Sequence, residues 1–218
     1  MEQMIEPGIA RRGGRPSRRD AQERLKRVLD IAQRHFLKVG YKETTLEGVA
    51  RAAGVAKKTL YHHFNGKSDL FAHILERLLR NWIAELSDIV LSSGKPVHVL
   101  NAVALRLLEV GTTPEKIKMH RLLLLEADRF PKAVRVIYDK RGALLGMKPL
   151  FNYLISAVAA GELEIDDVDL ATEQFVHLVR GGIRERLLLG ITKRPSVSER
   201  RRMAKQAVTI FLAGVRSS

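Results

Sequence analysis

The sequence contains no cysteine, which excludes disulfide bonds and metal sites built from thiolates. It also contains no apolar run approaching the roughly 20 residues that a membrane-spanning helix requires. The basic residues near the N-terminus are not followed by the apolar segment of a secretory signal peptide. We therefore predict a cytoplasmic protein that has no membrane partner.

The signatures of the common enzyme classes are absent as well. There is no His-Glu-x-x-His and no Gly-x-Ser-x-Gly, and the triplet Gly66-Lys67-Ser68 has Tyr61 where a phosphate-binding loop needs its first glycine. His62 and His63 are adjacent, so on a helix they would point about 100° apart and would not share a metal ion. We therefore predict that the protein is not an enzyme and holds neither a metal ion nor a cofactor.

Positive charge, in contrast, is abundant. The 218 residues include 38 Lys and Arg against 24 Asp and Glu, which gives a net charge of +14 and a pI near 10.4. A surface this basic attracts polyanions, either nucleic acid or an anionic membrane. Residues 1–18 form a basic arm that is either a solvated tail or a segment that places Arg15 and its neighbours in a narrow minor groove of DNA. The arm lacks the apolar face that a helix lying on a membrane requires.

After residue 19, apolar residues recur at spacings of three and four along most of the chain, which is typical of amphipathic helices. No segment shows the alternation of β-branched residues that a strand would need. We predict an all-α fold of about nine helices, with a long helix over residues 67–95 between an N-terminal domain at 19–66 and a larger helical domain at 96–218. Capping-box patterns, Thr44 with Glu47 and Ser196 with Glu199, mark two of the expected helix starts.

Two short helices within residues 45–64 are joined by the turn AAGVAKK, which predicts a helix-turn-helix. The second helix, from about Lys57 to His63, would enter the major groove with its N-terminal residues facing base edges. Lys57 and Lys58 stand at its N-terminus, where the helix dipole also attracts phosphate. On spacing alone, the segment is either a recognition helix or an ordinary solvated basic helix. Glu47 either closes its capping box or faces a cytosine amino group.

Residues 44–71, TTLEGVARAAGVAKKTLYHHFNGKSDLF, resemble the DNA-binding signature of TetR/AcrR-type transcriptional regulators. The matching positions are Thr45, Val49-Ala50, Ala53-Gly54-Val55, Thr59-Leu60-Tyr61, Phe64, Lys67 and Leu70. The resemblance implies a three-helix DNA-binding domain followed by a larger domain for effector binding and dimerisation. It implies DNA contacts from Thr45, Lys57, Lys58, Thr59, Tyr61, His62, His63 and Lys67. Ala56 departs from the pattern, because serine is frequent there, and we expect the recognition helix to begin without a side-chain cap.

The same resemblance implies a sequence-specific regulator, a repressor, that binds a palindromic operator in double-stranded DNA as a homodimer and is released by a small-molecule effector. The last two helices would pair across the dimer through Phe175, Leu178, Gly182, Val208, Phe211 and Leu212. The same faces also fit the core of a monomer. An effector pocket would be lined by Trp82, Leu86, Leu107, His120, Leu124, Phe151, Leu154 and Phe175, residues that equally suit an ordinary core. The alternative function is a sequence-neutral architectural DNA-binding protein without effector control.

Overall fold

The computed structural model describes residues 18–90, 94–131 and 140–215, and these residues form helices and loops without any strand. The all-α prediction is therefore confirmed. The described helices are α1 (Arg18–Glu43), α2 (Leu46–Ala53), α3 (Lys57–His63), α4 (Lys67–Val90), α5 (Pro96–Gly111), α6 (Pro114–Leu125), the 3-10 turn η1 (Ala127–Arg129), α8 (Lys140–Ala159), α9 (Val168–Leu189) and α10 (Val197–Val215).

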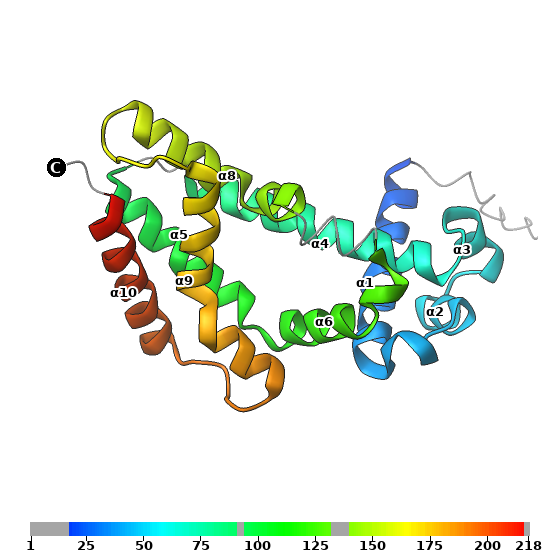
Figure 1. Cartoon of the computed structure of the whole chain (residues 1–218). Helices are drawn as coiled ribbons and strands as arrows, with labels where there is room; N and C mark the ends of the chain where they lie inside the picture. Colours follow the sequence, from blue (N-terminus) through cyan, green and yellow to red (C-terminus); the bar gives the residue numbers. More distant parts are fainter. Residues whose placement is uncertain (1–17, 91–93, 132–139, 216–218) are drawn as a thin grey trace, which may run out of the picture.

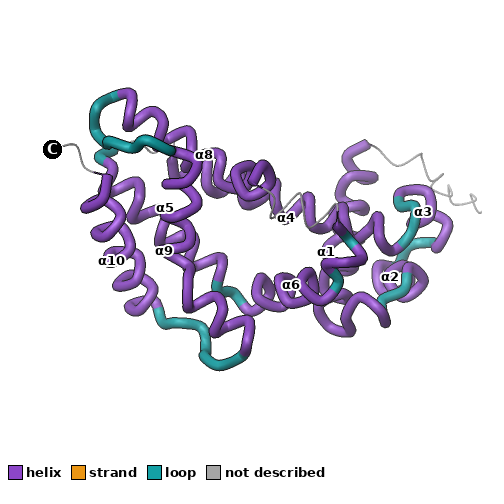
Figure 2. Tube along the Cα trace, in the orientation of Figure 1, coloured by secondary structure: helices purple, strands orange, loops and turns teal. Residues whose placement is uncertain are grey.

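The helices form two groups at opposite ends of an elongated molecule. Helices α1, α2 and α3 lie at one end, while α5, α8, α9 and α10 pack together at the other (Figure 1). Helices α4 and α6 run between the two groups, and loops join the helices (Figure 2). None of the described helices combines the length and the apolar character that would let it cross a membrane.

Each group of helices has its own hydrophobic core. The N-terminal core gathers buried side chains of α1 to α4, and it also takes in the end of α6 and the residue after η1. There, Phe130 lies edge-on to Tyr41, with ring centroids 4.8 Å apart, and its centroid is 5.2 Å from that of Phe71. The second core joins α5, α8, α9 and α10 around the fully buried Phe175. Although α6 follows α5 in the sequence, its last turn packs with the N-terminal domain and thereby connects the two cores.

Candidate nucleic-acid interface and internal cavity

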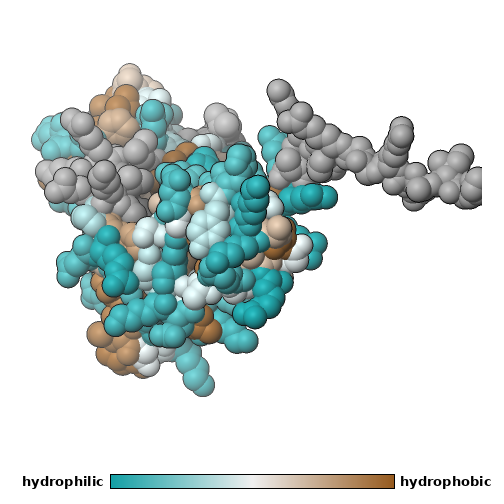
Figure 3. Space-filling view, turned by 90° about the vertical axis from the view of Figure 1, so that its right-hand side faces the viewer, coloured by the Kyte–Doolittle hydropathy of each residue, from teal (hydrophilic) through white to brown (hydrophobic). Residues whose placement is uncertain are grey.

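Helix α3 is fixed to the N-terminal core by two side chains. Leu60 is 1% exposed and Phe64 is 2% exposed, and both belong to the core that includes α1, α2 and α4. Because these two residues point inward, the remaining side chains of the helix face solvent. The exposed set is Lys57, Lys58, Thr59, Tyr61, His62 and His63. At the end of the molecule that carries α2 and α3, the surface formed by the described residues is mostly hydrophilic (Figure 3).

The turn between α2 and α3 has the backbone geometry that the sequence predicts. Gly54 adopts a left-handed conformation with φ of 65°, and its N–H donates to the carbonyls of Ala50 and Arg51. This conformation favours glycine, because a side chain at positive φ is strained. Helix α3 then begins after Ala56, and no side chain caps its first turn. The expectation that this helix begins without a side-chain cap is confirmed.

The start of α2 differs from the prediction by one residue. Thr45, rather than Thr44, is the N-cap, and its hydroxyl oxygen accepts a hydrogen bond from Gly48 N at 3.0 Å. The Thr44 hydroxyl instead donates to the Gly40 carbonyl at 2.7 Å, since α1 continues past a non-helical Gly40 to Glu43. The predicted capping box of Thr44 with Glu47 is therefore wrong, and the Glu47 carboxylate is available for another contact.

Glu47 uses its carboxylate to join α2 to α3. Its Oε1 lies 2.5 Å from the ammonium of Lys57 and accepts a hydrogen bond from the Tyr61 hydroxyl at 3.2 Å. The Lys57 ammonium also lies 5.5 Å from the centroid of the Tyr61 ring. The hydrogen bond from Lys57 lowers the pKa of Glu47, and the same contact raises the pKa of Lys57. Three exposed side chains on the face of the helix-turn-helix thus share one arrangement before any DNA is bound.

Lys67 stands at the first position of α4, where a phosphate contact is predicted. Its ammonium donates to the carbonyls of Tyr41 and Lys42, at 2.8 and 2.9 Å. It also lies 4.5 Å from the centroid of the Tyr41 ring. An ammonium has three N–H donors, so these two hydrogen bonds stabilise the C-terminal end of α1 and leave one donor for a phosphate oxygen. The other predicted contact, Arg15, lies outside the described residues.

A cavity of about 1000 Å³ lies among α4, α5, α6 and α9. Three of the predicted pocket residues line it, namely Trp82, Leu107 and His120. Four others do not border this cavity: Leu124 is 54% exposed, Phe151 is half-buried, and Leu154 and Phe175 are fully buried in the core. The side chain of Leu86 lies outside the described part of the chain.

The predicted dimer face of α9 and α10 is largely internal. Phe175, Val208, Phe211 and Leu212 are buried within the chain, and the rings of Phe175 and Phe211 pack edge-on with centroids 5.0 Å apart. The apolar periodicity that marked these four residues therefore reflects the core of the chain itself, and their side chains leave little surface for a second copy. Leu178 and Gly182 are exposed, as an interface would require. Next to Leu178, an outward groove of about 410 Å³ is lined by Arg202, Met203, Gln206 and Ile210, which the sequence reasoning missed.

Within residues 18–90, 94–131 and 140–215, no three His, Asp or Glu side chains are grouped closely enough to hold a metal ion.

Comparison with known proteins identifies the family. Residues 28–74 match the model of the "Bacterial regulatory proteins, tetR family", and residues 98–214, more than half of the chain, match the "AefR-like transcriptional repressor, C-terminal domain". The chain belongs to the TetR family. The relatives of this chain are named as transcriptional regulators. The prediction that the protein is a regulator and not an enzyme is therefore confirmed.

Two curated TetR-family relatives illustrate the extent of the similarity. The chain is 38% identical over 114 residues to the transcriptional regulator AcrR of Shigella flexneri, and this match covers 51% of each protein. It is 28% identical over 184 residues to TtgR of Pseudomonas putida, covering 80% of this chain and 85% of TtgR. The chain thus spans about half the length of the AcrR relative and most of the length of TtgR.

Two solved structures of regulators illustrate the similarity in fold. A TetR-family protein from Mesorhizobium loti superposes with a TM-score of 0.84 at 23% identity, covering 93% of this chain and 100% of that one. The flavonoid-responsive regulator FrrA superposes with a TM-score of 0.68 at 27% identity, covering 89% of this chain and 98% of FrrA. The prediction of a TetR/AcrR-type regulator is confirmed.

Proposed function

We propose that the protein is a sequence-specific DNA-binding repressor of transcription that acts as a homodimer in the cytoplasm and is released from its operator by a small molecule. The observation that carries this proposal is the orientation of α3. Its two apolar side chains, Leu60 and Phe64, are buried, so its basic and aromatic face is turned to solvent in one defined place. A helix held in this way, with its N-terminus exposed, suits the major groove.

The proposed contacts divide between base edges and the DNA backbone. Lys57 and Lys58, at the N-terminus of α3, are in the position that meets base edges in helix-turn-helix proteins. Thr59, His62 and His63 would donate to phosphate oxygens, and Tyr61 would do so when its hydroxyl leaves Glu47. Thr45 uses its hydroxyl oxygen as a cap, and its O–H remains free to donate to a phosphate. Lys67 would use its third N–H donor in the same way.

A dimer supplies the affinity that one module lacks. A single module makes only about four or five phosphate contacts, which give mainly salt-sensitive and non-specific binding. Two modules on a palindromic site double these contacts and read two half-sites. We propose that the chains pair through the outer surface of α9 and α10, which includes the exposed Leu178, Gly182, Gln206 and Ile210 and the half-buried Met203.

The cavity is the proposed effector site, and α6 is the proposed link from it to DNA. Lys116 and His120 of α6 line the cavity, while Phe130, shortly after α6, packs in the N-terminal core. At the other side of α6, the guanidinium of Arg121 donates to the carbonyls of Leu187 and Leu188 at 2.6 Å, which holds α6 against the end of α9. A ligand that shifts α6 therefore shifts the DNA-binding domain. A coupling free energy of about 1 to 3 kcal/mol is enough for such a switch.

The proposal is tested by titrating the purified protein onto the DNA upstream of its own gene and onto a shuffled fragment of equal length, by fluorescence anisotropy at several salt concentrations. We expect tighter binding to the native fragment at about 0.15 M salt, a protected site with two related halves, and a two-chain stoichiometry per site. Lys57→Ala should weaken specific binding about ten- to hundred-fold if Lys57 reads a base. Lys193→Ala, an exposed lysine in the α9–α10 loop, is the matched control.

An architectural protein without sequence preference would behave differently in the same experiment. Its affinity for the native and shuffled fragments would be equal and would fall steeply with salt on both. A genome-wide selection of bound fragments completes the test, because a regulator whose operator lies elsewhere will enrich a discrete site, whereas a coating protein will enrich none.

A further inference from the structure

The wall of the cavity has two chemically distinct parts. One part is apolar and includes Trp82, Leu107 and Met147. The other is a basic cluster, by which we mean Lys116 and His120 on α6 together with Arg180 and Arg184 on α9. These four side chains are half-buried, so they lie inside the wall and not on the outer surface of the molecule.

Contacts inside the basic cluster fix its geometry. The Arg184 guanidinium lies 2.6 Å from His120 Nδ1, which makes the imidazole an acceptor and therefore a neutral group. The Arg180 guanidinium lies 5.2 Å from the centroid of the Trp82 ring, at the junction between the basic and apolar parts of the wall. It also packs against Gly111, where a side chain would come within 3.4 Å of Arg180 Nε. The cavity thus presents a cation directly beside the Trp82 ring.

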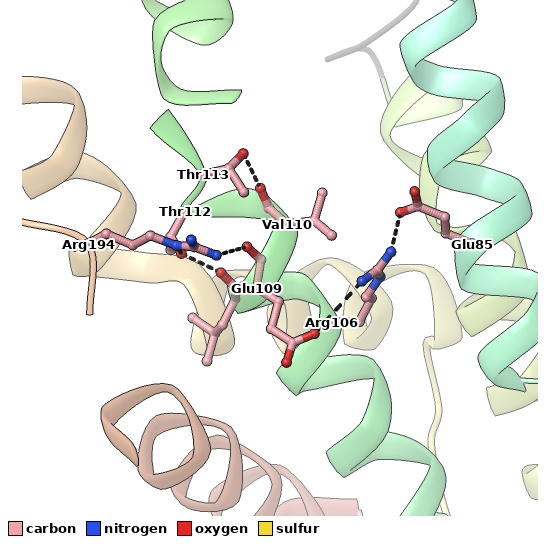
Figure 4. Close-up of polar contacts among 8 residues, drawn as sticks. Glu85, Arg106, Glu109, Val110, Thr112, Thr113 and Arg194 are labelled. Carbon is pink, nitrogen blue, oxygen red and sulfur yellow. Dashed lines mark hydrogen bonds and ion pairs between the residues drawn. The ribbon is translucent and has the colours of Figure 1, made fainter. Parts of the chain in front are cut away.

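Burial and neighbouring charges act differently on the two members of the basic cluster that lie on α6. Burial is the main cause that lowers the pKa of Lys116, and among its charged neighbours Glu85 raises this pKa more than Arg180 lowers it. Burial, Arg184 and Arg180 together lower the pKa of His120 to about 4. Glu85 is already bound by Arg106 of α5, at 3.0 Å (Figure 4). Among the described residues, the Lys116 ammonium makes no hydrogen bond or ion pair.

Acidic side chains also border the cavity, but at its rim. Asp167, Asp169, Glu173 and Glu185 are all exposed, in contrast to the half-buried bases. Asp167 caps α9 by accepting from Leu170 N at 2.9 Å, and Glu173 lies 3.8 Å from His177, four residues further along the same helix. Solvent screens such exposed carboxylates, so they offset the buried positive charge only weakly.

We propose that the cavity binds an organic carboxylate, with the apolar body of the ligand against Trp82 and Leu107 and its carboxylate between Lys116 and Arg180. This inference rests on the proposed role of the cavity as the effector site and names the class of effector. A half-buried ammonium without a partner is costly, and a carboxylate that reaches it gains charge-assisted hydrogen bonds from Lys116 and Arg180. A cavity of about 1000 Å³ accommodates a ligand of ordinary drug size.

The test uses the full-length protein and two sets of probes that differ only in the polar group. The linear set is decanoate, decanol and decyltrimethylammonium, and the aromatic set is biphenyl-4-carboxylate with its alcohol and its aminomethyl analogue. Isothermal titration calorimetry measures the affinities. Because Trp82 is the only tryptophan, its fluorescence reports binding of the linear set at this cavity.

We expect the carboxylate to bind at least about ten-fold more tightly than its neutral and cationic analogues in at least one set. Equal or tighter binding of the neutral or cationic probe in both sets, or no binding of either carboxylate, would overturn the proposal.

Variants locate the carboxylate. Lys116→Met should weaken binding of the carboxylate about ten-fold while binding of the alcohol changes little, and Arg180→Gln should act in the same direction. Lys118→Met removes the same charge from an exposed position on α6 and should leave both affinities unchanged. Circular dichroism melts confirm that each variant is folded, and the Lys116 and Arg180 variants test the site independently of each other. Loss of carboxylate binding in Lys118→Met, or no loss in either cavity variant, would contradict the assignment.

Release of DNA is measured in the same titrations and separates the two proposals. If a carboxylate binds at Trp82 without releasing operator DNA, the ligand class stands and the role of the cavity as a switch fails. If only a neutral or cationic compound binds and releases DNA, the switch stands and the carboxylate proposal fails.

Discussion

Glu47 on α2 and Lys57 on α3 form an ion pair, with Oε1 and Nζ 2.5 Å apart. The pair lies on the surface that we propose faces DNA, and both side chains are largely exposed. Glu47 therefore has two opposing effects there. It holds Lys57 and Tyr61 in one arrangement, which favours a defined set of base contacts, and it places a negative charge close to the phosphates, which repels them.

Replacing Glu47 tests this balance. Glu47→Gln removes the repulsion and frees Lys57, so we expect the affinity for shuffled DNA to rise roughly three- to ten-fold. Affinity for the operator should rise less, because Lys57 is no longer held in place, and the ratio of operator to shuffled binding should fall. Fluorescence anisotropy at two salt concentrations measures both affinities. Glu162→Gln removes the same charge at an exposed position between α8 and α9, at the opposite end of the molecule, and should change neither. A weaker affinity for shuffled DNA in Glu47→Gln would show that Glu47 does not oppose phosphate binding.

The uncapped start of α3 offers a stabilising substitution. Ala56 is exposed and already has the extended backbone of an N-cap, with φ of −64° and ψ of 140°, but it provides no side-chain acceptor. Ala56→Ser should raise the free energy of unfolding by about 1 kcal/mol, because the hydroxyl accepts from a free N–H of the first turn. Urea unfolding at fixed protein concentration measures the change. Ala52→Ser, at an exposed position inside α2, should instead cost about 0.5 kcal/mol, since serine is a poorer helix former there. If both substitutions destabilise, α3 does not need the cap.

The sequence was most informative where local backbone chemistry decides the structure. Gly54 in the turn, Ala56 without a cap and the capping box of Ser196 with Glu199 were all predicted, and the structure contains each of them. The same pattern failed at Thr44, because α1 extends beyond Gly40 and the Thr44 hydroxyl donates to the Gly40 carbonyl of that helix. A capping motif specifies the contacts within one turn, whereas the end of the preceding helix decides which threonine becomes the cap.

The sequence was less informative where the partner of a side chain matters. Apolar periodicity marks Phe211 as inward-facing but does not say whether it meets its own chain or a second copy, and it packs on Phe175 of its own chain. Of the basic cluster, the sequence indicated only His120, since Lys116 and Arg180 lie on different helices and each one alone is typical of a solvated surface. Only the packing of α6 against α9 brings them to one cavity.

The outer groove of α9 and α10 predicts how the chains associate. Ile210 is 50% exposed and lines this groove, so Ile210→Glu should change the stability of the chain by less than about 0.5 kcal/mol. A buried charge at the proposed interface should nevertheless convert the dimer to a monomer at micromolar concentration, as measured by sedimentation velocity. Thr209→Glu places the same charge at the neighbouring exposed position outside the groove, and this variant should remain dimeric. A dimeric Ile210→Glu would exclude this groove from the interface.

The low pKa of His120 predicts how the stability depends on pH. Burial and the charges of Arg184 and Arg180 lower the pKa of His120 from 6.5 to about 4, so the native protein binds fewer protons than the unfolded chain between these values. The stability that the neutral imidazole contributes is therefore complete above pH 6.5 and is lost as the pH falls towards 4.

His120 is only partly buried, and after allowance for solvent screening we expect the free energy of unfolding to fall by about 1 kcal/mol. His120→Gln keeps an acceptor for Arg184 but does not titrate, so its stability should fall less between pH 7 and pH 5. Urea unfolding at fixed protein concentration measures both proteins, with His98→Gln, an exposed histidine, as the control for loss of a histidine. Parallel pH profiles for wild type and His120→Gln would show that the cavity does not disfavour a positive charge at this position.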